Sequence, residues 1–153
     1  MAATTPRPFA HWSALPLRLI VGYGFAAHGY AKLARGPDAF IDILHAIGVP
    51  LPAVMAWATI AFELVGGIAV LLGAFVAWFS VPMAIILLVA AFTVHLPYGF
   101  SSIKLLSVGP AGAQFGQPGY EADLLYLACL AALVLGGTGP WAVDRLWRRG
   151  SKA

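Results

Sequence analysis

The chain has 153 residues, of which 61% are hydrophobic and 10% are charged. A soluble domain of this length is typically about 45–50% apolar and about 25% charged, so the composition favours a protein that lies in a lipid bilayer. The net charge of +3 does not indicate nucleic-acid binding, because the basic residues lie at the chain ends and between apolar runs. The single cysteine, Cys129, excludes an intrachain disulfide.

Long apolar runs predict four membrane-spanning helices, each close to the roughly 20 residues that a bilayer requires. The first covers residues 13–33. The run over 53–96 would form one helix of about 66 Å, twice the bilayer core, so it must fold back near Gly73 into helices over 53–72 and 75–96. The last helix covers 121–137 and ends in a segment rich in glycine.

Two longer connections join these helices, over residues 35–52 and 97–119. The second is rich in glycine, proline and serine and is too long for a tight turn. No internal repeat or low-complexity linker is evident. The sequence therefore predicts an all-α fold, with residues 1–153 forming a single transmembrane domain. This domain would be a four-helix up-and-down bundle with an extracytoplasmic loop at about 97–119.

Basic residues are unequally divided between the two sides of the predicted bundle. One side holds Arg7, Arg18, Arg145, Arg148, Arg149 and Lys152; the other holds Lys32, Arg35 and Lys104. Because loops with more lysine and arginine remain in the cytoplasm, both termini are predicted to be cytoplasmic. Tryptophan lies near a predicted helix end at positions 12, 57, 78 and 141, as is typical of membrane interfaces.

The few ionisable residues inside the predicted spans are costly in hydrocarbon unless they are paired or hydrated. The predicted orientation places most of them in the extracytoplasmic half, with Glu63 near mid-bilayer. It predicts one cavity, open to the extracytoplasmic side and lined by His28, Lys32, Glu63, His95 and Glu121. The first two helices are expected to approach closely below that cavity through the small residues Gly22, Ala26, Gly66 and Gly67.

Each polar residue has both a functional and a structural interpretation. Glu63, His95 and His28 are candidate catalytic residues, because a carboxylate and neutral imidazoles can transfer protons near pH 7. Alternatively, Glu63 forms a structural pair with Lys32 or a histidine, and His95 bonds a loop carbonyl. Lys32 and Glu121 are candidate ligand-binding residues. Lys32 could instead extend to the membrane interface, and Glu121, with Asp123, could be an acid favoured by the helix dipole.

Three further features complete the residue-level interpretation. Arg18 is expected to anchor the chain at lipid headgroups. Tyr98 and Phe100, beside Gly99, suit a planar ring or a lid, although an ordinary interfacial turn would show the same pattern. A metal site from two histidines and Glu63 is conceivable, but no spacing matches a ligand motif, so no metal is predicted.

Six short segments occur in a fixed order along the chain: 17–19 (LRL), 28–33 (HGYAKL), 63–67 (ELVGG), 71–73 (LLG), His95 with 99–100 (GF), and 120–121 (YE). Together they resemble the DoxX family of membrane proteins, over residues 15–144. The resemblance implies a four-helix, multi-pass protein of the bacterial cytoplasmic (inner) membrane. It also implies redox work, since the family takes its name from a subunit of a thiosulfate:quinone oxidoreductase and includes proteins linked to thiol, quinone or oxidative-stress metabolism.

The expected function is therefore a membrane subunit of a quinone-linked oxidoreductase, with the bilayer and a partner redox subunit or further copies of the chain as partners. The chain has no cysteine pair, nucleotide motif or evident haem ligand pair, so electrons would pass through a quinone or a partner subunit. The glutamate and histidines would relay protons, and Lys32 or a histidine would bond a quinone carbonyl. The alternatives are a membrane carrier or receptor for a small apolar or weakly acidic ligand, and a structural subunit.

Overall fold

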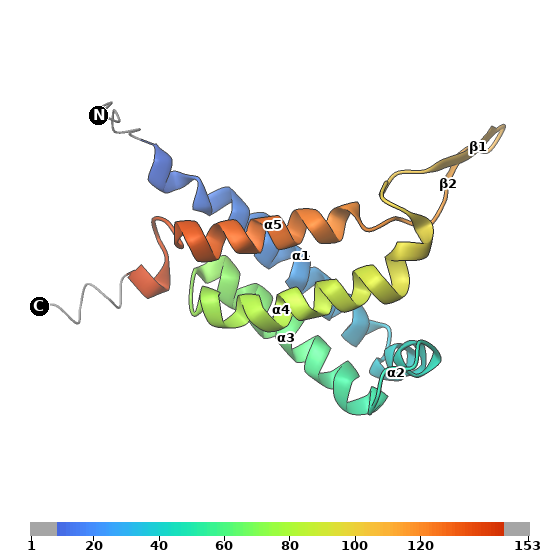
Figure 1. Ribbon diagram of the computed structural model, residues 1–153, viewed down its shortest axis with the longest axis horizontal. Helices are drawn as coiled ribbons and strands as arrows, with labels where there is room; N and C mark the ends of the chain where they lie inside the picture. The colour runs from blue at the N-terminus through green and yellow to red at the C-terminus, as the bar shows by residue number, and fades with distance from the viewer. Residues whose placement is uncertain (1–8, 146–153) are drawn as a thin grey trace, which may run out of the picture.

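The computed structural model describes residues 9–145, which are mostly helical. Within them, four longer helices run roughly along the long axis: α1 (Ala14–Ala34), α3 (Pro52–Leu72), α4 (Val76–Ala90) and α5 (Glu121–Gly136) (Figure 1). Helix α1 packs on α3 and α5, and α4 also packs on both. Three segments lie together at one end of the structure, which we call the basic end: the start of α1, the α3–α4 turn and residues 137–145 (Figure 1). A 3₁₀ turn, Ala10–Trp12, precedes α1 there.

The opposite end, which we call the hairpin end, carries two elements that the sequence did not predict (Figure 1). Residues 35–52, expected to be a loop, contain α2 (Pro37–Ala46). Residues 97–119 contain an antiparallel hairpin of β1 (Leu105–Gly109) and β2 (Gly112–Phe115), so the fold is not purely α-helical. Both elements are shorter than the apolar runs that predict spanning helices, which explains why they were missed.

The longer helices begin and end within one residue of the predicted bounds, except at the end of α4. There the α-helix stops at Ala90 and continues as a π-helical turn, Ala91–His95, and a 3₁₀ turn, Leu96–Tyr98. Two helices, Pro52–Leu72 and the continuous stretch Val76–Tyr98, are long and apolar enough to cross a membrane. Helix α3 ends at a left-handed glycine, Gly73 (φ 68°), where the sequence predicts the turn.

Glycine allows α1 and α3 to approach each other closely. A Cβ atom on Gly67 would lie 2.5 Å from the backbone nitrogen of Ala26, and one on Gly22 would lie 2.6 Å from that of Leu71. A side chain at either position would therefore push the backbones apart. The prediction was wrong for Gly66, which faces Phe79 and Met83 of α4 instead of α1.

Arg18 does not anchor the chain at a headgroup, because its side chain is buried between helix ends. Its guanidinium donates hydrogen bonds to the carbonyls of Thr138 (2.8 Å), Pro140 (3.0 Å) and Leu71 (3.0 Å). Carbonyls at helix C-termini lack intrahelical partners and attract cations. Arg18 therefore links α1 to the end of α3 and to the segment after α5.

Candidate functional site

A lysine and a glutamate from neighbouring helices form the first polar pair at the hairpin end. Lys32 Nζ of α1 lies 2.7 Å from Glu63 Oε1 and 2.5 Å from Glu63 Oε2 of α3. The side chain of Glu63 is 5% exposed and that of Lys32 is 23% exposed. Gly29 makes the approach possible, because a Cβ atom there would lie 2.9 Å from that of Glu63.

The second polar pair joins the π-helical turn after α4 to the start of α5. His95 Nδ1 lies 2.6 Å from Asp123 Oδ2, and the Asp123 side chain is 7% exposed. A carboxylate beside one ring nitrogen fixes the orientation of the imidazole. Within residues 9–145, the other ring nitrogen of His95 has no hydrogen-bond partner, so it is available to a ligand or a proton.

Both pairs line one cavity of about 690 Å³, which lies at the hairpin end among α1, α2, α3, the end of α4 and α5. Its remaining polar lining comes from His28 of α1, Arg35 directly after α1 and Gln117 before α5. The cavity lining therefore includes two carboxylates, two basic side chains and two histidines. Most of the rest of the lining is apolar or aromatic and includes Phe25, Ala39, Phe40, Ile43, Ile86, Leu87, Val94 and Tyr126.

Two aromatic rings complete the lining beside the polar pairs. The Phe40 ring of α2 lies under Lys32, with its centroid 5.0 Å from Nζ, which is a cation–π geometry. The Tyr126 ring of α5 packs edge-on against Phe25, with centroids 5.8 Å apart. A Cβ atom on Gly24 would overlap the Tyr126 hydroxyl, so this glycine leaves room for the phenol. An apolar cavity with a few polar groups is typical of sites for small organic ligands.

Four of the five residues predicted to line one cavity do so: His28, Lys32, Glu63 and His95. The prediction was wrong for Glu121, whose carboxylate accepts a hydrogen bond from the Ser102 backbone amide and holds the loop before α5. Neither alternative considered for Lys32 or His95 matches its contacts, since Lys32 binds a buried carboxylate and His95 binds Asp123. The alternative for Glu63, an ion pair with Lys32, is present.

Tyr98 and Phe100 do not line the cavity. Lys104 lies over the Tyr98 ring at 5.7 Å, and Phe100 packs against Tyr120 with centroids 5.7 Å apart. These contacts fit the alternative prediction, an ordinary turn that closes the end of α4. The conceivable metal site is not formed either: across residues 9–145, the acidic, histidine and cysteine side chains do not gather in threes that could hold a metal ion.

The sequence did not predict three residues that contact others in the cavity lining. Asp123 contacts His95, Phe40 contacts Lys32, and Tyr126 contacts Phe25. Asp123 and Glu121 lie about 200° apart around α5, so only one of them can point into the cavity. Helix α5 is apolar on all sides, and the sequence therefore contains no signal for which one does. Phe40 belongs to α2, which was not predicted.

The family model of DoxX matches residues 13–96. A relative from Bacillus subtilis (strain 168), named putative oxidoreductase CatD, is 37% identical over 138 residues, which cover 90% of this chain and 89% of the relative. The chain belongs to the DoxX family. No solved structure matches it. Within the DoxX segment lie His28, Lys32, Glu63 and His95, whereas Asp123 and Tyr126 lie beyond it. The family match therefore covers the Lys32–Glu63 pair and one member of the second pair.

Proposed function

We propose that the chain is an integral membrane protein of the bacterial cytoplasmic membrane, a four-helix bundle that forms one domain with both termini in the cytoplasm. Exposed apolar surface supports this, because the apolar stretch Val76–Tyr98 is only 22% buried, whereas a core helix of a soluble protein is mostly buried. Large apolar side chains also face outward elsewhere, for example Ile20, Val65, Val81 and Leu125. A bilayer is the environment that such a surface suits.

The two cations of α1, Arg18 and Lys32, are also compatible with a position in the bilayer. Charged groups are costly in hydrocarbon unless they are paired or turned inward. Arg18 bonds backbone carbonyls and Lys32 bonds Glu63, so neither cation needs to face lipid. Helix α5 measures about 24 Å, a few ångströms short of an average bilayer core, and local thinning accommodates a mismatch of this size.

A reporter experiment tests the proposed topology. Fusions of alkaline phosphatase, which is active outside the cytoplasm, and of a fluorescent protein that matures inside it would be made after Lys104 and at the C-terminus. The fusion after Lys104 should show phosphatase activity and the C-terminal one fluorescence. If both sites report the same side, the topology is wrong. Resistance of the whole chain to alkaline carbonate extraction tests membrane integration separately.

Within this membrane we infer that the chain is a subunit of a quinone-linked oxidoreductase of sulfur, thiol or quinone metabolism, with the cavity as its quinone site. The observation that carries this proposal is that two acid–base pairs line one largely apolar cavity. The relative's name, an oxidoreductase, supports the reaction class. The apolar and aromatic wall suits a flat ring, and the lysine and histidine supply hydrogen-bond donors.

The residues have separate roles in this proposal. A bound quinone accepts two electrons and two protons, and the electrons come from a partner redox subunit. Lys32 Nζ, held by Glu63, donates a hydrogen bond to a ring carbonyl. His95, oriented by Asp123, delivers a proton from its free ring nitrogen and regains one from solvent through the exposed His28. The second proton comes from the Lys32 ammonium group that bonds the carbonyl, and Glu63 relays a proton from solvent back to Lys32.

Binding of a water-soluble benzoquinone analogue to the detergent-purified chain provides the test. His95→Leu and Lys32→Met should each weaken binding about tenfold, since each removes one hydrogen bond to the ligand. His45→Leu on α2 is the matched control, because His45 is exposed and does not line the cavity. Folded variants that bind the analogue as tightly as the unaltered chain would rule out a quinone site here.

The carrier or receptor function remains the second candidate, because both polar pairs are already satisfied within the protein. A site of this kind can bind a weakly acidic ring without reacting. Such a protein would bind a phenol as tightly as a quinone, and the phenol would be recovered unchanged. If the chain copurifies with a redox subunit and reduces quinone only in that complex, the oxidoreductase proposal is supported over this one.

A further inference from the structure

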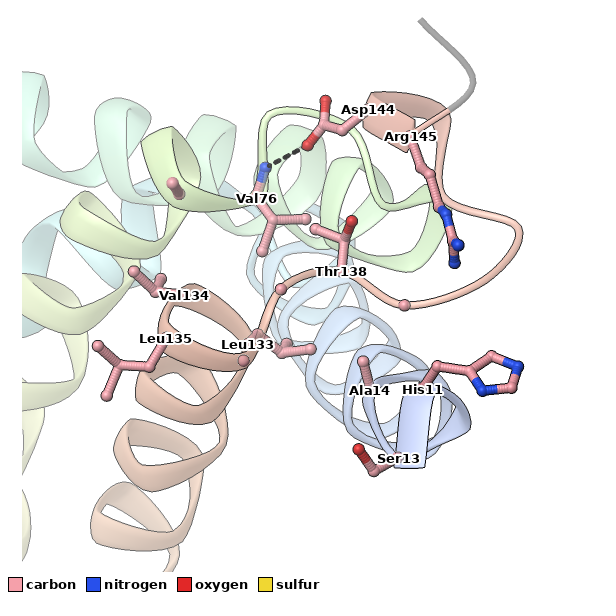
Figure 2. Close-up of a pocket in the computed structure, with 14 residues that line it drawn as sticks. His11, Ser13, Ala14, Val76, Leu133, Val134, Leu135, Thr138, Asp144 and Arg145 are labelled. Carbon is pink, nitrogen blue, oxygen red and sulfur yellow. Dashed lines mark hydrogen bonds between the residues drawn. The ribbon is translucent and has the colours of Figure 1, made fainter. Parts of the chain in front are cut away.

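A second cavity, of about 570 Å³, lies at the basic end, at the other end of the helices from the polar pairs (Figure 1). It is bounded by the start of α1, the start of α4, the end of α5 and residues 136–145, as Figure 2 shows. One wall is apolar and consists of Val76 and Ala77 of α4 with Leu133, Val134 and Leu135 of α5. The rim is polar, with His11 and Arg145 as its basic side chains.

The charges at this end leave Arg145 without a counter-charge. The carboxylate of Asp144 is engaged with the start of α4, where it accepts hydrogen bonds from the amides of Phe75 (2.8 Å) and Val76 (3.4 Å). Figure 2 shows Asp144 turned toward Val76 and Arg145 directed to the side of the cavity where His11 lies. Among residues 9–145, Arg145 has no ion-pair partner.

No other acidic side chain can supply that counter-charge. The chain has six acidic residues, and the five besides Asp144 lie on α2, within α3 or at the start of α5: Asp38, Asp42, Glu63, Glu121 and Asp123. The sequence outside residues 9–145 contains no aspartate or glutamate but does contain further arginine and lysine. The protein therefore supplies no counter-charge to Arg145, which leaves this side chain available to an external anion.

The apolar wall indicates what kind of anion fits. Leu135 of this wall is itself exposed, and α4 carries further outward-facing apolar side chains, Trp78 and Val81. A free phosphate ion gains nothing from such a wall. An amphiphile with a phosphate group can place the phosphate at the basic rim and its acyl chains along α4 and α5. Basic pockets between helices on the cytoplasmic side are suited to anionic headgroups.

We propose that this cavity binds the headgroup of an anionic phospholipid, with Arg145 and His11 donating hydrogen bonds to the phosphate. The inference rests on the membrane placement in the proposed function, not on the quinone site. The lipid neutralises the basic rim, and its acyl chains cover the groove between α4 and α5. Because the ligand occupies the edge of the bundle, the two cavities bind independently.

Lipid retention in nanodiscs tests the proposal. The full chain would be reconstituted in equimolar phosphatidylglycerol and phosphatidylcholine, released by native mass spectrometry, and the retained lipids counted. The unaltered chain should retain phosphatidylglycerol preferentially. Arg145→Gln and His11→Gln should each lower that preference about fivefold, and the double variant about thirtyfold. Arg145→Lys should keep most of it. Lys104→Gln, at the hairpin end, is the matched control and should leave it unchanged.

The outcomes separate this proposal from the membrane proposal. Arg145 and His11 are exposed, so the variants should fold, and an unchanged thermal midpoint would verify this. A double variant that keeps the full preference overturns the headgroup site. Displacement of the lipid by millimolar inorganic phosphate would also overturn it, because a soluble phosphate would then be the ligand. If the chain leaves the membrane in alkaline carbonate, the membrane placement itself fails.

Discussion

Two cations on the same helix, Arg18 and Lys32, are stabilised in different ways. At the hairpin end, Lys32 of α1 meets a carboxylate, with both oxygens of Glu63 within 2.7 Å. At the basic end, Arg18 of α1 meets no carboxylate, and its guanidinium donates to backbone carbonyls 2.8 to 3.0 Å away. One arrangement balances a charge with an opposite charge, whereas the other balances it with carbonyl dipoles at the end of α3 and in the segment after α5.

Because of this difference, the charges and partners can change at the Lys32–Glu63 pair but not at Arg18. A lysine and a glutamate can exchange a proton or release each other when a ligand offers a better partner. An arginine remains charged at any accessible pH, and its planar head fixes several carbonyls at once. The hairpin end therefore has the properties of a reactive or binding site. Arg18 has those of a permanent link between α1, α3 and the segment after α5.

Removal of Arg18 should have the largest effect. Arg18→Met leaves three buried or partly buried carbonyls without donors, and each hydrogen bond to a charged group contributes about 1.5–3 kcal/mol. The loss should exceed about 3 kcal/mol, a large part of a typical folding free energy. Little monodisperse protein should be obtained on size exclusion in detergent. The stability of Arg18→Lys should lie between that of Arg18→Met and that of the unaltered chain. If Arg18→Met is as stable as the unaltered chain, Arg18 does not link α1 to α3 and the segment after α5.

Breaking the Lys32–Glu63 pair should have the next largest effect, measured as thermal unfolding in detergent. Glu63→Gln leaves an ammonium group without its carboxylate and should cost about 2 kcal/mol, less than a fully buried pair because Lys32 is 23% exposed. Lys32→Met combined with Glu63→Gln should recover part of that loss. Asp42→Asn, on the exposed face of α2, is the control. Additive losses in the double variant would show that the two residues do not act as a pair.

The packing between these two ends should respond to a single methyl group. Gly24 lies between Arg18 and Lys32 on α1, and a Cβ atom there overlaps the Tyr126 hydroxyl. Gly24→Ala should cost about 1–3 kcal/mol by overpacking. Tyr126→Phe in the same chain should restore part of the thermal midpoint, because it removes the overlapping oxygen. Ala27→Ser, at an exposed position of α1, is the control. Another glycine such as Gly36 is unsuitable as a control, because its φ of 94° would strain an alanine.

The β-hairpin should show the smallest effect although it lies at the same end as the cavity. Leu106 and Val108 are 69% and 74% exposed, and both strands lie away from the helices (Figure 1). Leu106→Thr and Val108→Thr should each change stability by no more than about 0.5 kcal/mol in detergent. A loss well above that value would mean that another surface covers the hairpin. Quinone-analogue binding measured on the same variants should be unaffected.

The candidate site was only partly predictable, because depth and rotation depend on different information. Counting residues along each apolar run places His28, Lys32, Glu63 and His95 at compatible depths, and all four line the cavity. Rotation requires an amphipathic pattern, which helices that are apolar on all sides lack. For this reason the sequence predicts Glu121 as the cavity-lining acid of α5, whereas the structure shows that Asp123 contacts His95.

Length, apolarity and the position of Gly73 are properties of the sequence alone, and they determined where the longer helices begin and end, except at the end of α4. They act locally, since apolar runs and a left-handed glycine restrict the chain wherever they occur. The tertiary structure alone decided which polar groups meet, because contacts such as Lys32 with Glu63 and Arg18 with Thr138 join residues far apart in the chain. It also decided that Arg18 is buried, since the carbonyls at the end of α3 and after α5 meet its guanidinium only once α1, α3 and α5 have packed.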